Sequence, residues 1–293
     1  MYINHNQMAT NVANTLTDHY GRLQTSTQRL SSGLRVNSAS DDAAGLAIRE
    51  LMRSDIAALN QGVRNANDAI SLIQTADGAL GVIDEKLIRM KELAEQAATG
   101  TYDSTQRLMI ESEYQAMASE ITRIAYATDF NNIKLLDGSL SGEHNGTKIA
   151  AEGKLKVHFG TMNDSAEDYY YIEIGDCTAS ALGVGNQASE EAKAYTVSTQ
   201  AAAQKALVGI NDAIVSKDKI RAHLGALQNR LENTITNLTT QAENLQAAES
   251  RISDVDVATE MTQFVRNQIL TQSAVAMLSQ ANSMPQMAMQ LIG

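Results

Sequence analysis

The stretch IRAHLGALQNRLENTITNLTTQAENLQAAESRISDV (220–255) decides the fold, because its apolar residues recur at alternating intervals of four and three. This spacing puts them in one stripe along an α-helix, as in a coiled-coil-like seam. The stripe consists of Ile220, Leu224, Leu227, Leu231, Leu238, Leu245, Ala248, Ile252 and Val255, with Thr234 and Gln241 as polar interruptions. A helix over 220–255 would be roughly 50 Å long at ~1.5 Å per residue, which is typical of a rod and too long for a compact domain.

Similar spacing appears in the N-terminal half of the chain. The first series is Ala9, Val12, Leu16, Leu23 and Leu30, with the polar residues His19 and Ser26 in two of its positions. The second series runs from Leu59 to Ile73, slips by one residue, and resumes from Ala76 to Ala94. The third series is Ile110, Tyr114, Met117, Ile121 and Ile124. Each series predicts an amphipathic helix that packs along a narrow seam.

Polar segments separate the helical series. SSGLRVNSASDD (31–42) predicts an extended or turning connection, and Thr99-Gly100-Thr101 predicts a break between the second and third helices. Asn131-Asn132 and Asp137-Gly138 close the N-terminal half. Between them and residue 200, LKVHF (155–159) and YYYIEI (169–174) alternate with a period of two and predict a β-hairpin with a long loop. We expect this insert to lie on the outside.

Composition and charge restrict the class of protein. Aromatic residues make up 4% of the 293 residues, there is no Trp, and the formal net charge is -11. That charge disfavours nucleic acid or an anionic membrane as a partner. The one cysteine, Cys177, cannot form an internal disulfide, and we expect an inert side chain. The first residues lack a basic region followed by an apolar run, so we expect no cleaved secretory signal.

The two ends of the chain are unusual in charge. Residues 1–17 contain no Lys, Arg, Asp or Glu, and residues 261–293 contain only Arg266. Terminal segments are usually loose and solvated, whereas these combine an uncharged surface with helical apolar spacing. One interpretation is a pair of terminal helices docked on their own domain. The interpretation that we favour is that both ends are disordered in the isolated chain and fold only when subunits polymerise.

Several motifs resemble bacterial flagellins. RLSSGLRVNSASDDAAGLAI (29–48) is similar to the family's N-terminal signature, and FNNIKLLDG (130–138) is similar to the segment that closes its N-terminal half. LGALQNRLENTITNL (224–238) and ISDVDVATEMTQFVRNQILTQSAVAMLSQANSMPQ (252–286) resemble its C-terminal region. The resemblance covers 1–140 and 200–293, in the order expected for the family.

The resemblance implies a mainly α fold, a long antiparallel helical rod with coiled-coil terminal helices and a small β-hairpin insert. It implies helices at 43–98, 104–128 and 200–250. The implied domains are an N-terminal inner-core helix and connection (1–42), two parts of a helical rod domain (43–138 and 200–252), a short exposed insert (139–199), and a C-terminal inner-core helix (253–293).

The function implied by the resemblance is that of a structural subunit that is exported unfolded and polymerises into an extracellular helical filament for motility. The implied partners are other copies of the chain, a flagellar export chaperone, the type III export apparatus, the filament cap and the hook–filament junction proteins. The N-terminus would be an uncleaved export signal. We expect no cofactor.

Two sets of residues are candidates for contacts. The residues expected to pack in the filament core are Val12, Leu16, Leu23, Leu30, Met261, Val265, Ile269, Val275 and Leu278. LIRMKELAEQ (87–96) resembles the segment that the vertebrate innate flagellin receptor recognises, and the matching positions are Arg89, Leu93 and Glu113. Lys91 and Glu95 depart from the commonest pattern of that segment.

Other classes of protein fit the sequence less well. A hook–filament junction protein shares the terminal helices, and an adhesin or binding module would use the tyrosine-rich insert. The sequence contains no HExxH, GxGxxG, P-loop, GxSxG or CxxC motif, and its histidines form no metal-ligand pair at helical spacing, so we expect no enzyme. The Asp41-Asp42 pair is expected to cap the helix that follows it.

Overall fold

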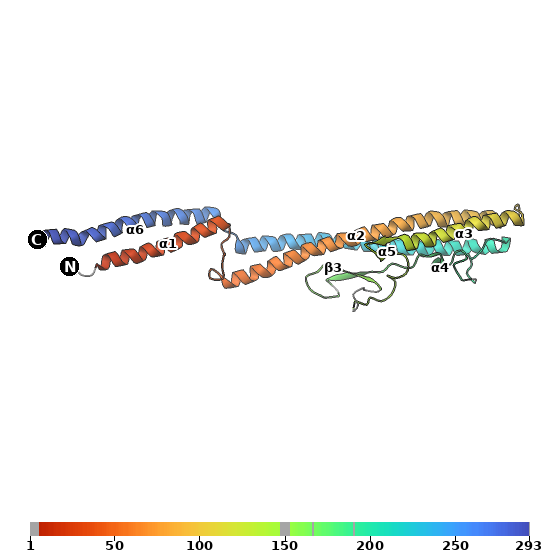
Figure 1. The fold of residues 1–293 in the computed structure, drawn as a ribbon, viewed down its shortest axis with the longest axis horizontal. Helices are drawn as coiled ribbons and strands as arrows, with labels where there is room; N and C mark the ends of the chain where they lie inside the picture. The colour runs from red at the N-terminus through yellow and green to blue at the C-terminus, as the bar shows by residue number, and fades with distance from the viewer. Residues whose placement is uncertain (1–5, 147–152, 166, 190, 293) are drawn as a thin grey trace. The chain divides into compact units, whose positions relative to one another are not determined.

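The computed structural model describes residues 6–146, 153–165, 167–189 and 191–292, and shows a mainly α chain in two compact units (Figure 1). Unit 1 comprises Met1–Ile56 and Glu243–Gly293, and unit 2 comprises Ala57–Ala242. The predicted domain ranges 1–42, 139–199 and 253–293 each include residues outside the described part of the chain. Helices α2 (Ala43–Ala98) and α5 (Gln200–Ser253) belong to both units.

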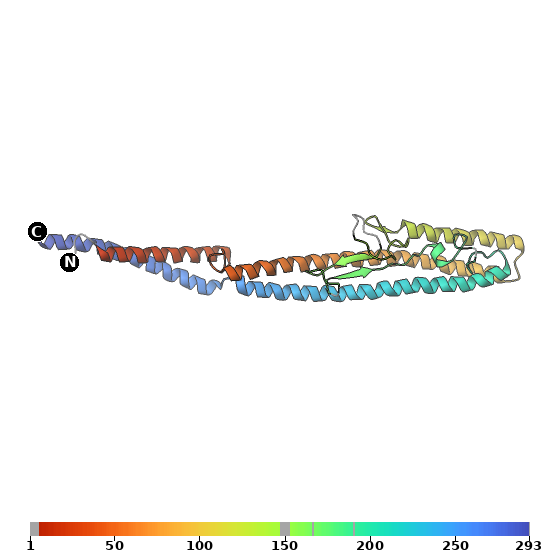
Figure 2. The same cartoon turned by 90° about the horizontal axis from the view of Figure 1, so that it is seen from below.

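Unit 1 is built on the two terminal helices, α1 (Gln7–Ser32) and α6 (Val257–Ile292). Both views show them side by side (Figures 1 and 2). They run antiparallel, because the Asn6 side-chain amide donates to the carbonyl of Ala281 at 2.8 Å while Arg29 lies 3.8 Å from Glu260 at the other end. The pairing of the terminal helices is therefore confirmed. Gly33 ends α1 in the left-handed region at φ 73°, which a glycine adopts without strain.

Unit 2 contains a core of long helices. α2 and α5 run together with α3 (Ser104–Ala127), which follows the break at residues 99–103. The apolar residues of the series from Ala76 to Ala94 are fully buried, as are Tyr114 and Ile121 of α3. These residues of the series are Ala76, Leu80, Ile83, Leu87, Met90 and Ala94. The Tyr114 hydroxyl donates to the carbonyl of Ala194 at 2.7 Å, which satisfies the one polar atom of that buried ring. The predicted helices 43–98, 104–128 and 200–250 are confirmed to within a few residues.

Helix α5 departs from the predicted stripe in two places. Gln241 is exposed and Ala242 is buried, so the seam moves by one residue after Leu238. The helix also ends at Ser253, two residues before the last residue of the predicted stripe, Val255. The Val255 amide donates to the carbonyl of Gly33, in the α1–α2 connection, at 3.0 Å.

Ion pairs connect α2 and α5 within unit 2. The Lys217 ammonium lies 2.5 Å from Asp84 and 2.7 Å from Asp218, and the Lys217 side chain is 1% exposed. Arg221 lies 2.7 Å from Asp77. Buried charges are tolerated only when they are paired, so these contacts favour one register of α5 against α2. The apolar stripe alone does not distinguish registers that differ by a heptad.

The insert forms a hairpin that packs on both long helices. β3 (Leu155–His158) pairs antiparallel with β4 (Tyr169–Ile172), with Val157 opposite Tyr170. The predicted hairpin is confirmed. The Asn65 amide of α2 donates to the carbonyl of His158 at 2.8 Å, and the Arg230 guanidinium of α5 lies 4.1 Å from the Tyr170 ring centroid. Gly62 permits this approach, because a Cβ there would lie 2.0 Å from the carbonyl oxygen of Phe159.

Before the insert, a second, two-residue pairing joins β1 (Asp129–Phe130) to β2 (Ile133–Lys134) through Asn131 and Asn132, both at positive φ.

The rest of the insert is more deeply packed than the sequence predicted. The segment after β4 includes the short helix α4 (Ala179–Leu182) and buries Cys177, Val184 and Val197 completely. Burial raises the pKa of the Cys177 thiol to about 12. The thiol stays protonated and behaves as a small packed side chain.

The buried Lys217 pair supplies a stability test. Replacing Lys217 by Ala removes its packed stem and the partner of Asp84, and we expect unit 2 to lose roughly 2–4 kcal/mol. Replacing Lys217 by Met keeps the packed volume but also leaves Asp84 unpaired, so we expect a smaller loss than for Ala, by about the packing contribution of the stem. Denaturant unfolding of the unpolymerised chain measures both. The exposed neighbour Lys219→Ala is the control, and an equal loss for Ala and Met would contradict this account.

Candidate assembly interface

The seam between α1 and α6 is made of small and polar side chains. Its most buried residues are Ser26, Glu260, Asn267, Thr271, Ala274 and Ala281. Small residues let the two helices approach closely, but they withdraw little apolar surface from water. No large apolar side chain of α1 or α6, among those described, is fully buried in the pair. The pair therefore gains little hydrophobic stabilisation from its own contact.

Large apolar side chains point outward from α6 instead. The exposed fractions of Met261, Val265, Ile269 and Val275 are 44%, 43%, 57% and 48%. Leu270, Met277, Met284 and Met287 are exposed as well. Together these residues surround α6 on the sides that α1 leaves uncovered. A helix that is apolar all round is typical of one buried on several sides.

The remaining predicted core residues lie in or beside the seam. Val12, Leu16, Leu23 and Leu30 on α1 are half-buried, as is Leu278 on α6. The structure thus divides the predicted set into residues that α1 and α6 share and four residues of α6 that have no partner in one chain. The sequence did not distinguish these two roles, because both faces of α6 carry apolar residues at helical spacing.

Polar atoms in α1 also lack partners. Among the described residues, the buried side-chain nitrogens without a hydrogen-bond partner are Nδ1 of His19 and Nε of Arg29, and both belong to α1. Buried polar atoms are nearly always paired in folded proteins. The helix pair therefore leaves the hydrogen-bonding capacity of these two shielded atoms unused.

The two connections of unit 1 bind each other. Leu34 and Asp254 form an antiparallel bridge, and the Arg35 amide donates to the carbonyl of Ser253 at 2.6 Å. Val36 is completely buried, and the Arg49 guanidinium of α2 donates to its carbonyl at 3.0 Å. These contacts join the α1–α2 connection to the α5–α6 connection and to the first turns of α2.

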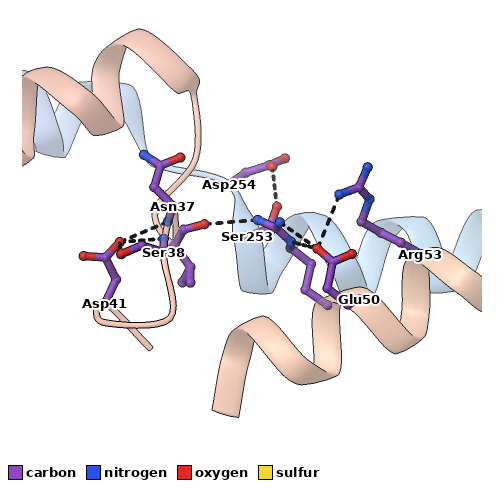
Figure 3. Close-up of polar contacts among 9 residues, drawn as sticks. Asn37, Ser38, Asp41, Glu50, Arg53, Ser253 and Asp254 are labelled. Carbon is purple, nitrogen blue, oxygen red and sulfur yellow. Dashed lines mark hydrogen bonds and ion pairs between the residues drawn. The ribbon is translucent and has the colours of Figure 1, made fainter. Parts of the chain in front are cut away.

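Asp41 and Asp42 accept hydrogen bonds from different parts of the chain. Asp42 accepts the Gly45 amide at 2.9 Å and caps α2, as predicted. Asp41 does not cap the helix, because its carboxylate accepts the amides of Ser38 and Asn37 at 3.0 and 3.1 Å and closes the turn before it (Figure 3). These hydrogen bonds, the one from the Ser38 amide first, lower the pKa of Asp41 below its ordinary value.

The receptor-like positions lie on α2 and α3 in unit 2. The Arg89 guanidinium donates to Glu113 at 3.0 and 2.8 Å and to Glu92 at 2.9 Å, and all three side chains are exposed. Leu93 is 1% exposed, so its side chain belongs to the core beneath this surface. The structure brings Arg89 and Glu113 together on the surface, whereas Leu93 is buried and does not share that surface.

The described part of the chain shows no cluster of three or more His, Cys, Asp or Glu side chains arranged to hold a metal ion. None of the described helices has the length and apolar character needed to cross a membrane.

Comparison with protein families gives two matches that together cover most of the chain. Residues 3–141 match the bacterial flagellin N-terminal helical region, and residues 207–292 match the bacterial flagellin C-terminal helical region. The unmatched residues between them contain the β3–β4 hairpin and α4.

Two known proteins are similar to the chain over their full length. A flagellin of Bacillus subtilis (strain 168) is 42% identical over 308 residues, with 100% of both chains covered. A flagellar filament 33 kDa core protein of Treponema phagedenis is 41% identical over 292 residues, again with 100% of both covered. A crystal structure of Bacillus cereus flagellin is 29% identical, covers 64% of this chain and 94% of its own, and has a TM-score of 0.47.

The turn held by Asp41 is expected to depend on pH. Because the folded-state pKa of Asp41 is lowered, its stabilisation of the turn is present above the ordinary value of about 3.9 and is lost as pH falls through the lowered value. Asp41→Ala should therefore reduce the amide-exchange protection of Asn37 and Ser38 at neutral pH. Hydrogen exchange resolved by residue measures this effect. Unchanged protection in the variant would refute the role given to the carboxylate.

Proposed function

The chain belongs to the bacterial flagellin family and is a structural subunit of a flagellar filament, and on that premise we propose that it assembles by burying the α1/α6 pair among copies of itself. The observation that carries this proposal is the exposure of Met261, Val265, Ile269 and Val275 on the sides of α6 that α1 does not cover. Neighbouring subunits would supply the missing partners.

The energetics favour a lattice over a single contact. Full burial of a Val, Leu, Ile or Met side chain contributes about 1.5–3 kcal/mol. Ordering the backbone costs about 1–2 kcal/mol per residue. Within one chain the α1/α6 seam buries small and polar residues, so the ordering cost is poorly offset. We infer that the pair becomes stable when several neighbours cover α6, which agrees with coupled folding and assembly.

We propose that unit 1 is the filament core of the subunit. Unit 2 has an apolar core of its own, from Leu59 to Ala94 on α2 and from Ala203 to Leu238 on α5, and also exposes large apolar residues such as Leu108 and Met109. The domain boundaries predicted at residues 42 and 252 remain part of this proposal. A head-to-tail contact that does not close into a ring would extend such subunits into a helix.

We further propose that the chain has no enzymatic role and that it leaves the cell unfolded through a type III export apparatus with a dedicated chaperone. It would then meet the filament cap and the hook–filament junction proteins at an extracellular filament. The lone, buried Cys177 supports this route, because no intrachain disulfide has to form after transit. The route requires a chain that refolds from denaturant without metal or oxidant.

We also propose that the vertebrate innate flagellin receptor contacts the exposed surface around Arg89 and Glu113, with Leu93 acting through the packing of α2. Arg89→Ala should weaken binding of the unpolymerised chain to the receptor ectodomain by about tenfold, the scale of a single interface residue. Surface plasmon resonance measures the affinity, with Arg64→Ala as a control on an exposed arginine of the same helix. Equal affinities for the two variants would refute the assignment.

Seeded growth tests the assembly proposal. Ile269→Asp places a carboxylate on the uncovered side of α6, where it cannot disturb the seam with α1. We expect a soluble chain with native helicity that does not elongate filament fragments, because burying an unpaired charge among neighbours is strongly unfavourable. Light scattering and electron microscopy of seeded solutions measure elongation. Leu16→Asp and Leu278→Asp, in the seam itself, are expected to block growth as well.

The control for Ile269→Asp is Met162→Asp, which changes another large apolar residue, 77% exposed, in the hairpin loop of unit 2. This variant should elongate seeds like the unmodified chain. Normal elongation by Ile269→Asp would exclude the packing role of α6. The same assay tests the alternatives, since a junction protein would cap the seeds and an adhesin would leave them unchanged.

A further inference from the structure

The basic residues of unit 1 are of one kind. Every lysine of the chain lies in unit 2, and the basic side chains of unit 1 are all arginines: Arg22, Arg29, Arg35, Arg49, Arg53, Arg251 and Arg266. Arginine binds carboxylates through two parallel hydrogen bonds and is less strongly hydrated than lysine. Protein interfaces are accordingly enriched in Arg and depleted in Lys. Unit 1 has the charged composition of a surface that becomes buried.

Three of these arginines line one groove between α1 and α6. The groove has a volume of about 730 Å³ and is lined by residues 17–29 of α1 and 259–270 of α6. Arg22, Arg29 and Arg266 face it together with the carboxylates of Asp18 and Glu260. Three positive charges against two negative ones leave the groove with one net positive charge. It therefore favours a negatively charged group.

The groove arginines make few polar contacts within a single chain. Nε of Arg29 is buried and has no hydrogen-bond partner, and the nearest carboxylate oxygen, on Glu260, lies 3.8 Å from its Nη1. Arg22 and Arg266 form no ion pair or hydrogen bond with any residue that the structure describes. Arg35, Arg49 and Arg53, by contrast, bind the carbonyls of Ile252 and Val36 and the carboxylate of Glu50.

The carboxylates of unit 1 divide into a paired group and an unpaired group. Asp41, Asp42, Asp254 and Asp256 accept local hydrogen bonds in the two connections. Asp55 on α2 and Glu243 and Glu249 on α5 have no partner in the described part of the chain. The unpaired arginines are thus Arg22 and Arg266 on the terminal helices and Arg251 on α5. The unpaired carboxylates are Asp18 on α1 and the three on the ends of the long helices.

We propose that the groove of Arg22, Arg29 and Arg266 binds the carboxylates of Asp55, Glu243 and Glu249 from a second copy of this chain. The contact joins two different surfaces, so it is head-to-tail and can repeat without closing. Charge complementarity contributes specificity more than affinity. The contact would therefore fix the direction and the register in which neighbouring chains pack against α6. The inference rests on the proposed function, since it requires that copies of the chain assemble.

Charge reversal tests the contact. Arg22→Glu with Arg266→Glu should slow seeded elongation by at least about tenfold, because attraction becomes repulsion at the groove. Asp55→Arg with Glu243→Arg and Glu249→Arg should slow it to a similar degree. The chain that carries all five substitutions restores the complementarity in reverse, and we expect it to elongate its own fragments again. Circular dichroism of each unpolymerised variant verifies its helicity.

The matched control is Arg251→Glu, the same substitution at an exposed arginine of unit 1 that does not line the groove. It should elongate seeds normally, whereas the single variant Arg266→Glu should not. Normal growth of the groove variant, or failure of the chain with all five substitutions to recover, would overturn the inference. Failure of the unmodified chain to elongate fragments would instead overturn the proposed function, so the two results are distinguishable.

Discussion

Helix α6 carries apolar side chains on every side, while a single chain gives it one helical partner. That mismatch is the constraint on which the rest of unit 1 depends. Pairing with α1 covers the side with Asn267, Thr271 and Ala274, and leaves Ile269 and Val275 in water. An apolar surface of this kind is unfavourable in an isolated subunit and stabilising in a polymer. Burial of this surface is the driving force that we propose for assembly.

The two units differ in how completely they bury large apolar side chains and pair polar ones. Unit 2 buries large residues such as Leu80, Leu87 and Tyr114 fully, and pairs the buried charge of Lys217. Both units expose some large apolar residues, but unit 1 concentrates them on the single helix α6 and leaves two polar nitrogens of α1 without partners. A subunit that must remain soluble before assembly needs at least one part that is complete alone. The acidic net charge of -11 adds mutual repulsion that salt screens.

The connections hold the start of α6 in place. Hydrogen bonds between Arg35 and Ser253 and between Val255 and Gly33 tie together segments that are more than two hundred residues apart in the chain. Asp42 caps the start of α2, and Asp41 closes the turn that precedes it. The two adjacent carboxylates thus stabilise the end of the α1–α2 connection and the first turn of α2. The apolar surface of unit 1 is thus attached to a defined corner of the chain, where the α1–α2 and α5–α6 connections meet.

The sequence by itself determined the helices, the hairpin and the family, because apolar spacing and a few long motifs are local properties of the chain. The uncharged ends of the sequence also led to the assembly surface that we propose. Only the tertiary structure separated Leu278, which lies in the seam, from Ile269, which faces away from it, and showed that Leu93 is buried beneath Arg89. It also assigned Asp84 to Lys217 and left Arg22 and Arg266 without partners. These facts depend on which segments pack against each other in the folded chain. Helical periodicity cannot supply them, because an apolar stripe has the same spacing whichever segment it packs against.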